Sequence, residues 1–131
     1  MEMEVTFPGG KRVDAQYRGF TIQTDQAVES GGKSSAPEPF NYFLASIGTC
    51  AGIYVLSFCQ QRKIPFDKIR LIQRMEDTAD GKMVGKISIE IKLPPDFPEK
   101  YRKAVVSSAN LCAVKKHLEN PPEFSVIATY S

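Results

Sequence analysis

Apolar and polar positions alternate over the first part of the chain, which predicts a β-meander at residues 1–24. Val5 and Phe7 are separated by a polar residue, and the same period of two returns between Val13 and Tyr17. Turn signals at 8–10 and 18–19 separate three apolar runs. The pattern therefore predicts three short strands joined by tight turns, followed by a glycine-containing loop.

A long helix is predicted at about residues 38–62. A proline in the first turn, with a serine before it and a glutamate beside it, is typical of a helix start. No charged residue follows Pro39 until Arg62, and Ile53 and Leu56 widen the apolar surface beyond one stripe. Such a helix must be covered on several sides. Its length nearly suffices to cross a membrane, but its small polar residues and strand-like flanks favour the central helix of a globular protein.

Residues 68–131 are predicted to contain a hairpin, two helices and a closing strand. Ile87, Ile89 and Ile91 alternate with polar residues, which predicts a strand with one buried and one solvent-facing side. The expected elements are strands at 68–76 and 83–93, a helix at 97–110, a short helix that carries Cys112, and a strand at 124–130. This order indicates an α+β fold, and the 131 residues suggest one domain, 1–131.

Charge and length exclude several classes of protein. The 17 basic and 15 acidic residues nearly cancel, and they form no basic stripe, so a nucleic-acid partner is not expected. The acidic N-terminus has no apolar run behind it, which argues against a secretory signal and for the reducing cytoplasm. One chain of this size covers such an apolar helix poorly, so an obligate homodimer is expected.

The three cysteines suggest one reactive pair and one core thiol. Cys50 and Cys59 share the long helix, where nine residues turn by half a circle and rise ~13.5 Å, so they cannot bond to each other. The pair expected is Cys50 with Cys112, and Cys59 is expected in the core. A zinc site that adds His117 is disfavoured because no Cys-x-x-Cys motif occurs, and no phosphate-binding loop is present. No metal or cofactor is expected.

The surroundings of the two paired cysteines differ. Lys115 and Lys116 follow Cys112 at one helical turn, and a position in the first turn of a helix would add positive potential. Both effects would favour the Cys112 thiolate. Cys50 lies among small residues with no local activating group, so a cation from elsewhere in the fold or from a second subunit is expected. Taken alone, each cysteine is more often an inert core thiol than a reactive one.

Two segments resemble the OsmC/Ohr superfamily of osmotically inducible and organic-hydroperoxide-resistance proteins. They are Gly31-Gly32 with Ala36 to Phe40 and Leu44 to Cys50, and Asn110 to Leu118. The resemblance implies an OsmC-like fold, an intertwined homodimer with long central helices wrapped by antiparallel sheets, and active sites at the subunit interface. It implies that Cys50 attacks a hydroperoxide and becomes a sulfenic acid. Cys112 then condenses with it to a disulfide, which an external dithiol reduces.

The chain departs from the pattern of the hydroperoxide reductases at the helix start. There a Pro-Glu pair opens the helix, and its glutamate steers an arginine onto the reactive thiolate. Here Phe40 follows Pro39, and Glu38 precedes it. The candidate activating residues are therefore Arg12 and Arg18, near the first two turns, together with Glu38. These departures resemble the less characterised OsmC-like branch of the superfamily.

The leading hypothesis is a thiol-dependent peroxidase, or a related thiol redox protein, acting on organic hydroperoxides. Phe40, Phe43 and Tyr54 would favour an alkyl substrate if they line the pocket. The first alternative is a non-catalytic thiol sensor or a dimer that binds a small apolar ligand. The second is a structural dimer whose cysteines are only core residues.

Overall fold

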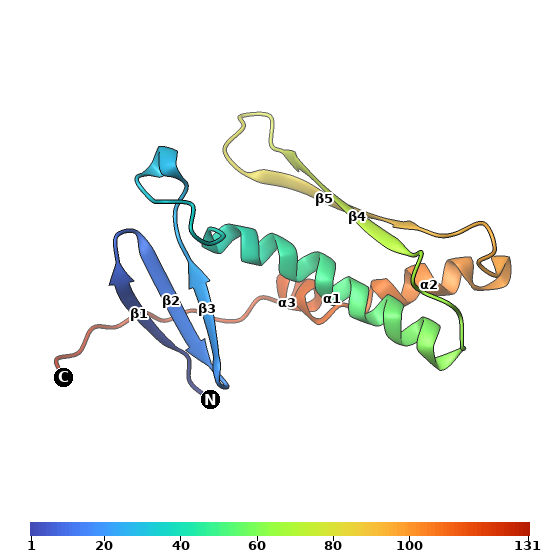
Figure 1. The fold of residues 1–131 in the computed structure, drawn as a ribbon, viewed down its shortest axis with the longest axis horizontal. Helices are drawn as coiled ribbons and strands as arrows, with labels where there is room; N and C mark the ends of the chain where they lie inside the picture. Colours follow the sequence, from blue (N-terminus) through green and yellow to red (C-terminus); the bar gives the residue numbers. More distant parts are fainter. The chain divides into compact units, whose positions relative to one another are not determined.

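Three antiparallel strands open the chain, as the alternating pattern predicts. They are β1 (Glu4–Gly9), β2 (Arg12–Tyr17) and β3 (Phe20–Thr24), in the spatial order β1-β2-β3 (Figure 1). Tyr17 pairs with Phe20 across a two-residue turn, in which Arg18 has φ 49° and Gly19 has φ 80°. Two consecutive positive φ angles give the turn the twist of the flanking strands, which is why glycine suits it.

The structure is a computed structural model that describes residues 1–131. Its two compact units are Met1–Ala45, with the β1–β3 sheet, and Ser46–Ser131. The long helix α1 (Pro39–Gln61) begins in the first unit and continues into the second, within one or two residues of the predicted range. The single domain expected from the sequence stays a prediction.

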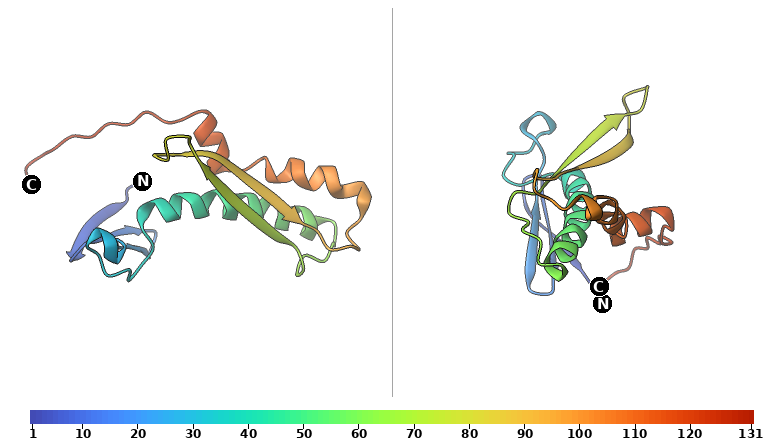
Figure 2. Two further views of the ribbon diagram at one scale, coloured as in Figure 1. Left: turned by 90° about the horizontal axis from the view of Figure 1, so that it is seen from above. Right: turned by 90° about the vertical axis from the view of Figure 1, so that its right-hand side faces the viewer.

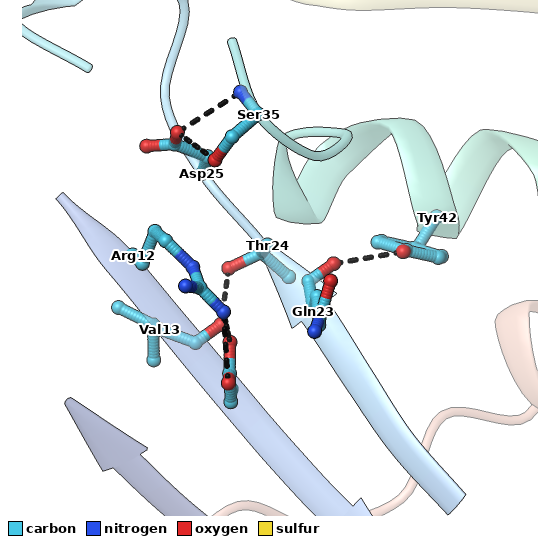
Figure 3. Close-up of polar contacts among 8 residues, drawn as sticks. Arg12, Val13, Gln23, Thr24, Asp25, Ser35 and Tyr42 are labelled. Carbon is cyan, nitrogen blue, oxygen red and sulfur yellow. Dashed lines mark hydrogen bonds and ion pairs between the residues drawn. The ribbon is translucent and has the colours of Figure 1, made fainter. Parts of the chain in front are cut away.

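A buried carboxylate organises the loop between β3 and α1 (Figure 3). The Asp25 side chain is 1% exposed and accepts hydrogen bonds from the backbone N–H groups of Gln26 (2.7 Å), Ser35 (3.0 Å) and Lys33 (3.3 Å). The hydroxyl of Ser35 donates to it as well, and the Asp25 N–H donates to the carbonyl of Pro37. These hydrogen bonds, the Ser35 hydroxyl first, lower the pKa of Asp25 to about 2.

Replacing Asp25 with asparagine is expected to destabilise the protein at neutral pH and to flatten its response to acid. The pKa of Asp25 is about 2 in the folded state and near 3.8 otherwise, so its carboxylate stabilises the fold above about pH 4. This contribution is lost as the pH falls from about 4 towards 2. Urea unfolding at pH 7, 4 and 3 measures it, and the exposed Asp67→Asn is the matched control. Equal acid sensitivity of wild type and Asp25→Asn would contradict the assignment.

Gly32 closes the same loop, where no side chain fits. A Cβ atom there would lie 2.0 Å from the carbonyl oxygen of Gln26, which is backbone and cannot move aside cheaply. Gly32→Ala is therefore expected to cost about 1–3 kcal/mol of stability. Gly52→Ala is the matched control, because its Cβ would meet only Leu71 Cδ2 at 4.0 Å, and alanine in a helix interior gains about 0.5–1 kcal/mol. The unfolding midpoint is expected to fall in Gly32→Ala and to rise in Gly52→Ala. Equal shifts in the two variants would refute the steric argument.

One stripe of α1 is buried and the remainder is partly or fully exposed. The buried residues are Ile47, Ala51, Val55, Phe58 and Cys59, whereas Ile53 is 52% exposed. The chain by itself therefore covers only one side of this apolar helix. By length and composition α1 could also cross a membrane, but core helices of globular proteins pass the same test.

The second unit packs a hairpin and two short helices against α1. The hairpin consists of β4 (Arg70–Asp77) and β5 (Val84–Lys92), antiparallel over their whole length. After the 3-10 turns η2 (Glu99–Tyr101) come α2 (Arg102–Ala109) and α3 (Ala113–Glu119). The hairpin and the helices α2 and α3 lie on different sides of α1 (Figure 2). The core between them contains Val55, Phe58, Cys59, Ile64, Phe97 and Val105.

The strand predicted at residues 124–130 is wrong for the single chain. The segment has no regular secondary structure, and Phe124, Val126, Ile127 and Tyr130 are 81% exposed or more. A strand needs the backbone groups of a neighbouring strand, and this segment pairs with neither sheet of its own chain. This apolar, β-prone segment therefore has no strand partner within its own chain.

Candidate functional site

The structure brings Cys50 and Cys112 together from different elements. Cys50 is half-buried in the middle of α1, and Cys112 is the 2% exposed residue that precedes α3. The Cys112 thiol contacts the Cys50 sulfur as a hydrogen bond and also lies 3.9 Å from the carbonyl oxygen of Ile47. Both cysteines are free thiols, so the fold holds two reduced sulfurs side by side.

The first turn of α3 points backbone donors at both sulfurs. The N–H groups of Val114 and Ala113 face Cys50. The N–H of Lys115 donates to the Cys112 sulfur over 3.4 Å, so that Cys112 caps the helix. The unpaired N–H groups at the start of a helix satisfy anions well, and a thiolate is such an anion. Cys112 lies next to this turn because it directly precedes it in the sequence, whereas Cys50 is brought to the same turn by the packing of α1 against α3.

These contacts shift the pKa values of the two thiols in opposite directions. The Val114 N–H lowers the pKa of Cys50, helped by the Cys112 thiol and the Ala113 N–H and opposed by burial. Burial raises the pKa of Cys112, and its neighbour Cys50 raises it further. The local expectation that Lys115, Lys116 and the helix start would favour the Cys112 thiolate is wrong, because burial outweighs the Lys115 N–H at this sulfur. The groups that lower the pKa of Cys50 come from a distant segment of the chain, but they are backbone N–H groups and not the cation that was expected.

The lysines after Cys112 do not act as expected. The ammonium of Lys115 donates to the side-chain oxygen of Asn110 over 2.8 Å, and it is the backbone N–H of Lys115 that reaches the sulfur. Neither Lys115 nor Lys116 contributes a charge effect to the pKa of Cys112. Burial, which disfavours a thiolate, is therefore the main influence on the pKa of Cys112 and favours its protonated form.

Cys59 lies in the core, as the helix geometry predicts. It is fully buried, and this burial raises the pKa of its thiol, with Arg62 opposing the shift. It is nine residues beyond Cys50 on the same helix. Its environment is that of an inert core thiol.

The three thiols are expected to alkylate in a fixed order. Because the pKa of Cys50 is lowered and the other two are raised, Cys50 holds the largest thiolate fraction at neutral pH. Its reaction with iodoacetamide should persist to lower pH, falling as the pH drops through the lowered pKa. Peptide mapping after timed labelling between pH 5 and 9 measures this order. Faster labelling of Cys112 would contradict the assignment.

The candidate activating residues lie in the first unit, each with a local role. Arg12 pairs with the carboxylate of Asp14 at 3.3 Å, beside the β2–β3 contacts of Figure 3. The guanidinium of Arg18 lies 5.1 Å from the centre of the Tyr17 ring. Glu38 is half-buried just before α1. Their roles as activators stay predictions.

The aromatic residues expected in a substrate pocket are distributed along α1. Phe40 and Phe43 stack on each other, with ring centres 5.3 Å apart, and both are exposed by more than a third. Tyr54 is half-buried, and its carbonyl oxygen accepts a hydrogen bond from the hydroxyl of Ser108. Their role as pocket residues stays a prediction.

A groove that the sequence did not reveal reaches the Cys112 side of the pair. It has a volume of about 500 Å³ and lies between β5, α1 and the two short helices. Its lining residues include Ile87, Ile89, Val106 and Leu118, together with Cys112. The isoleucine alternation in β5 was the available signal, because these side chains are only half-buried and face the groove. Cys50 is not among the residues that line it.

Comparisons with known proteins agree on a single family. The family model described as OsmC-like protein matches residues 31–127. The fold is similar to a protein of Psychrobacter arcticus 273-4, provisionally described as an osmotic-stress-induced and detoxification-response protein, with a TM-score of 0.71 and 23% identity over 87% of this chain and 85% of that one.

Two further solved structures share the fold. An OsmC-like protein from Mycoplasma pneumoniae has a TM-score of 0.69 and 12% identity, covering 92% of this chain and 87% of that one. An organic hydroperoxide resistance protein OsmC from Legionella pneumophila has a TM-score of 0.54 and 15% identity, covering 90% and 89%. A comparison with curated protein sequences gives no match.

Proposed function

The chain belongs to the OsmC-like protein family, and from this premise we propose that it is a thiol-dependent peroxidase that reduces organic hydroperoxides. The observation that carries the proposal is the contact between the Cys50 and Cys112 sulfurs, with a lowered pKa at one and a raised pKa at the other. An activated thiolate beside a protonated thiol is what a nucleophile and its resolving partner require.

The reaction has two steps on the protein. The Cys50 thiolate attacks the terminal oxygen of the hydroperoxide, the O–O bond breaks, and the alkoxide takes a proton from water to leave as an alcohol. Cys50 is then a sulfenic acid. The Cys112 sulfur attacks it, water leaves, and a disulfide joins the two residues. An external dithiol supplies two electrons to restore both thiols.

The α3 turn supports an activation that needs no arginine beside the thiolate. Val114 and Ala113 donate their N–H groups to Cys50. Backbone donors stabilise a thiolate as a cation does, although each is weaker than a full charge. This accounts for a chain that has Phe40 where the hydroperoxide reductases have the glutamate that steers their arginine. It also predicts that Arg12→Gln and Arg18→Gln variants keep the order of thiol labelling.

A turnover assay tests the proposal. Purified protein is mixed with dithiothreitol and an excess of cumene hydroperoxide, and loss of peroxide is followed. Many equivalents should be consumed per chain. The cumyl group should raise the rate over hydrogen peroxide by ~10-fold or more, the usual value of a few apolar contacts. Consumption of one equivalent or less would contradict an enzymatic role.

The groove favours one alternative, a non-catalytic sensor or a carrier of a small apolar ligand. Its volume of about 500 Å³ and its aliphatic walls suit such a ligand. Stoichiometric oxidation without turnover, together with saturable binding of a fluorescent fatty-acid analogue, would support this alternative. In either case we propose that the protein works in the cytoplasm, where thiols stay reduced.

The active protein is proposed to be a homodimer. Apolar side chains of α1 that the chain leaves exposed, Ile53 among them, need a cover. The residues 124–130 need a strand partner, and both edges of the β4–β5 hairpin and of the three-stranded sheet are open. A second copy of the chain supplies both the cover for α1 and the strand partner for residues 124–130. The family resemblance implies this arrangement, in which strands are exchanged between the two copies.

Ile53→Arg is expected to weaken the dimer by about 30-fold or more, which corresponds to the ~2 kcal/mol of an interface hot spot. Light scattering after size exclusion, over a range of concentrations, measures the effect. Val28→Arg, at a residue 64% exposed in the 3-10 turn η1 (Val28–Ser30), is the control. A wild-type protein that is monomeric at every concentration would refute the homodimer.

A further inference from the structure

A second cleft lies where α1 ends, away from the cysteine pair. It has a volume of about 530 Å³ and lies between the end of α1, the segment that leads to β4, and the segment that joins β5 to η2 (Figure 1). Gln61, the last residue of α1, is eleven residues beyond Cys50, a rise of ~16 Å along the helix. None of the three cysteines lines this cleft, so the proposed peroxidase reaction does not use it.

Positive charge predominates in the cleft and is not paired. Four cations line it against two carboxylates: Arg62, Lys63, Lys68 and Lys100 against Asp67 and Asp96. The ion pairs of the structure all involve other residues. Unpaired like charges in one cleft repel each other, and a bound anion would relieve that repulsion. The excess of two positive charges favours an anion that carries two or more negative charges.

Aromatic rings hold two of these cations in place. The guanidinium of Arg62 lies 3.7 Å from the centre of the Phe58 ring and donates to the carbonyl oxygen of Phe58 over 3.1 Å. Arg62 also lies 5.6 Å from the centre of the Tyr101 ring, and the ammonium of Lys100 lies 5.1 Å from the same centre. A side chain that is already fixed loses less entropy when a ligand binds. Arg62 keeps further N–H donors for such a ligand.

Lys63 occupies a backbone position that suits glycine better. It follows the end of α1 with φ 56°, and the next N–H, that of Ile64, donates back to the carbonyl oxygen of Cys59 over 2.9 Å. Glycine is the usual residue at such a helix end, because a side chain strains the left-handed backbone. Lysine makes this turn less stable than glycine would, but it adds a positive charge to the cleft.

We propose that this cleft binds a small phosphate-bearing anion, either a diphosphate or a phosphate ester with two or more negative charges. The planar guanidinium of Arg62 matches two phosphate oxygens at once, and the lysines add charge around it. The volume of about 530 Å³ exceeds what one phosphate group fills and leaves room for an organic part of the ligand. Because the cysteines lie outside the cleft, this inference does not depend on the proposed peroxidase function.

Isothermal titration calorimetry of the full chain tests the binding. The probes are inorganic pyrophosphate and adenosine diphosphate, with citrate as a polyanion that carries carboxylates instead of phosphates. Both phosphate probes should bind at one site per chain with a Kd below about 1 mM at low salt, and salt should weaken the binding by screening. Citrate should bind ~10-fold more weakly. No saturable binding of either phosphate probe, or equal binding of citrate, would overturn the inference.

Two variants test the cations of the cleft. Lys63→Gly and Lys100→Gln should each weaken pyrophosphate binding about 3- to 10-fold, because each removes one unpaired charge. The unfolding midpoint of Lys63→Gly should be no lower than that of wild type, so its loss of binding cannot come from a damaged fold. Lys103→Gln, at an exposed residue of α2 that does not line the cleft, is the control and should bind as wild type does. Wild-type binding in both cleft variants would overturn the inference.

A third variant should bind more tightly. Asp96→Asn removes one of the two carboxylates that oppose an anion in the cleft, so pyrophosphate binding should tighten about 3-fold. Asp77→Asn, at an exposed residue of β4 outside the cleft, is the control. Unchanged or weaker binding in Asp96→Asn would overturn the inference. Tighter binding of a single-stranded oligonucleotide than of adenosine diphosphate would overturn it as well, in favour of a nucleic-acid site.

Discussion

Replacing Cys50 with serine is expected to lower the rate of hydroperoxide reduction by ~10⁴-fold or more, the order that removal of a catalytic nucleophile costs. The Cys50 sulfur is the one toward which the α3 turn directs two N–H groups. A serine hydroxyl in its place stays protonated at neutral pH and does not attack peroxide oxygen. Loss of cumene hydroperoxide in the presence of dithiothreitol measures the effect.

Cys59→Ala is the control for this variant. Cys59 is fully buried in the core, and burial raises the pKa of its thiol. Its replacement removes a sulfur and creates a small cavity, so some stability is lost while turnover persists. If Cys59→Ala lost activity as Cys50→Ser does, and both stayed folded by circular dichroism, the reactive thiol would be misassigned.

Replacing Cys112 with serine is expected to separate the first step from the second. Cys50 keeps its backbone donors, so one equivalent of hydroperoxide is consumed and Cys50 stops as a sulfenic acid. Without a resolving thiol no disulfide forms, and the burst is followed by a slow phase. Trapping with dimedone, which reacts with sulfenic acids, should label Cys50 in this variant and little in wild type. Equal labelling would contradict the resolving role.

Serine and alanine at this position distinguish chemistry from helix capping. Cys112 accepts a hydrogen bond from the Lys115 N–H and so caps α3. A serine oxygen keeps that cap, whereas Cys112→Ala is expected to lose about 1 kcal/mol of stability in addition. Both variants should lack the disulfide. A serine variant as unstable as the alanine variant would contradict the capping contact.

The regular elements could be predicted because their patterns are local. The alternation in β5, the turn at Arg18 and Gly19, and the uncharged run of α1 each follow from spacing within about twenty residues. The closing strand failed for the opposite reason. Residues 124–130 have the composition of a strand, but strand formation depends on a partner that is distant in the sequence or in another chain.

The pairing of Cys50 with Cys112 could be predicted, but not the groups that lower the pKa of Cys50. Helix geometry separates Cys50 from Cys59, which leaves Cys112 as the partner. The donors to Cys50 are backbone N–H groups of residues more than sixty positions away, and a sequence shows side chains, not the direction of backbone groups. The burial that raises the pKa of Cys112 is likewise a property of the assembled core.

The most direct test of the account is mass spectrometry of the reduced protein after one equivalent of cumene hydroperoxide. Loss of peroxide is timed in the same tube, and the sample is quenched, alkylated under denaturing conditions and mapped. The account predicts rapid loss matched by a Cys50–Cys112 disulfide, with Cys59 alkylated. Unreacted peroxide and three intact thiols would contradict it.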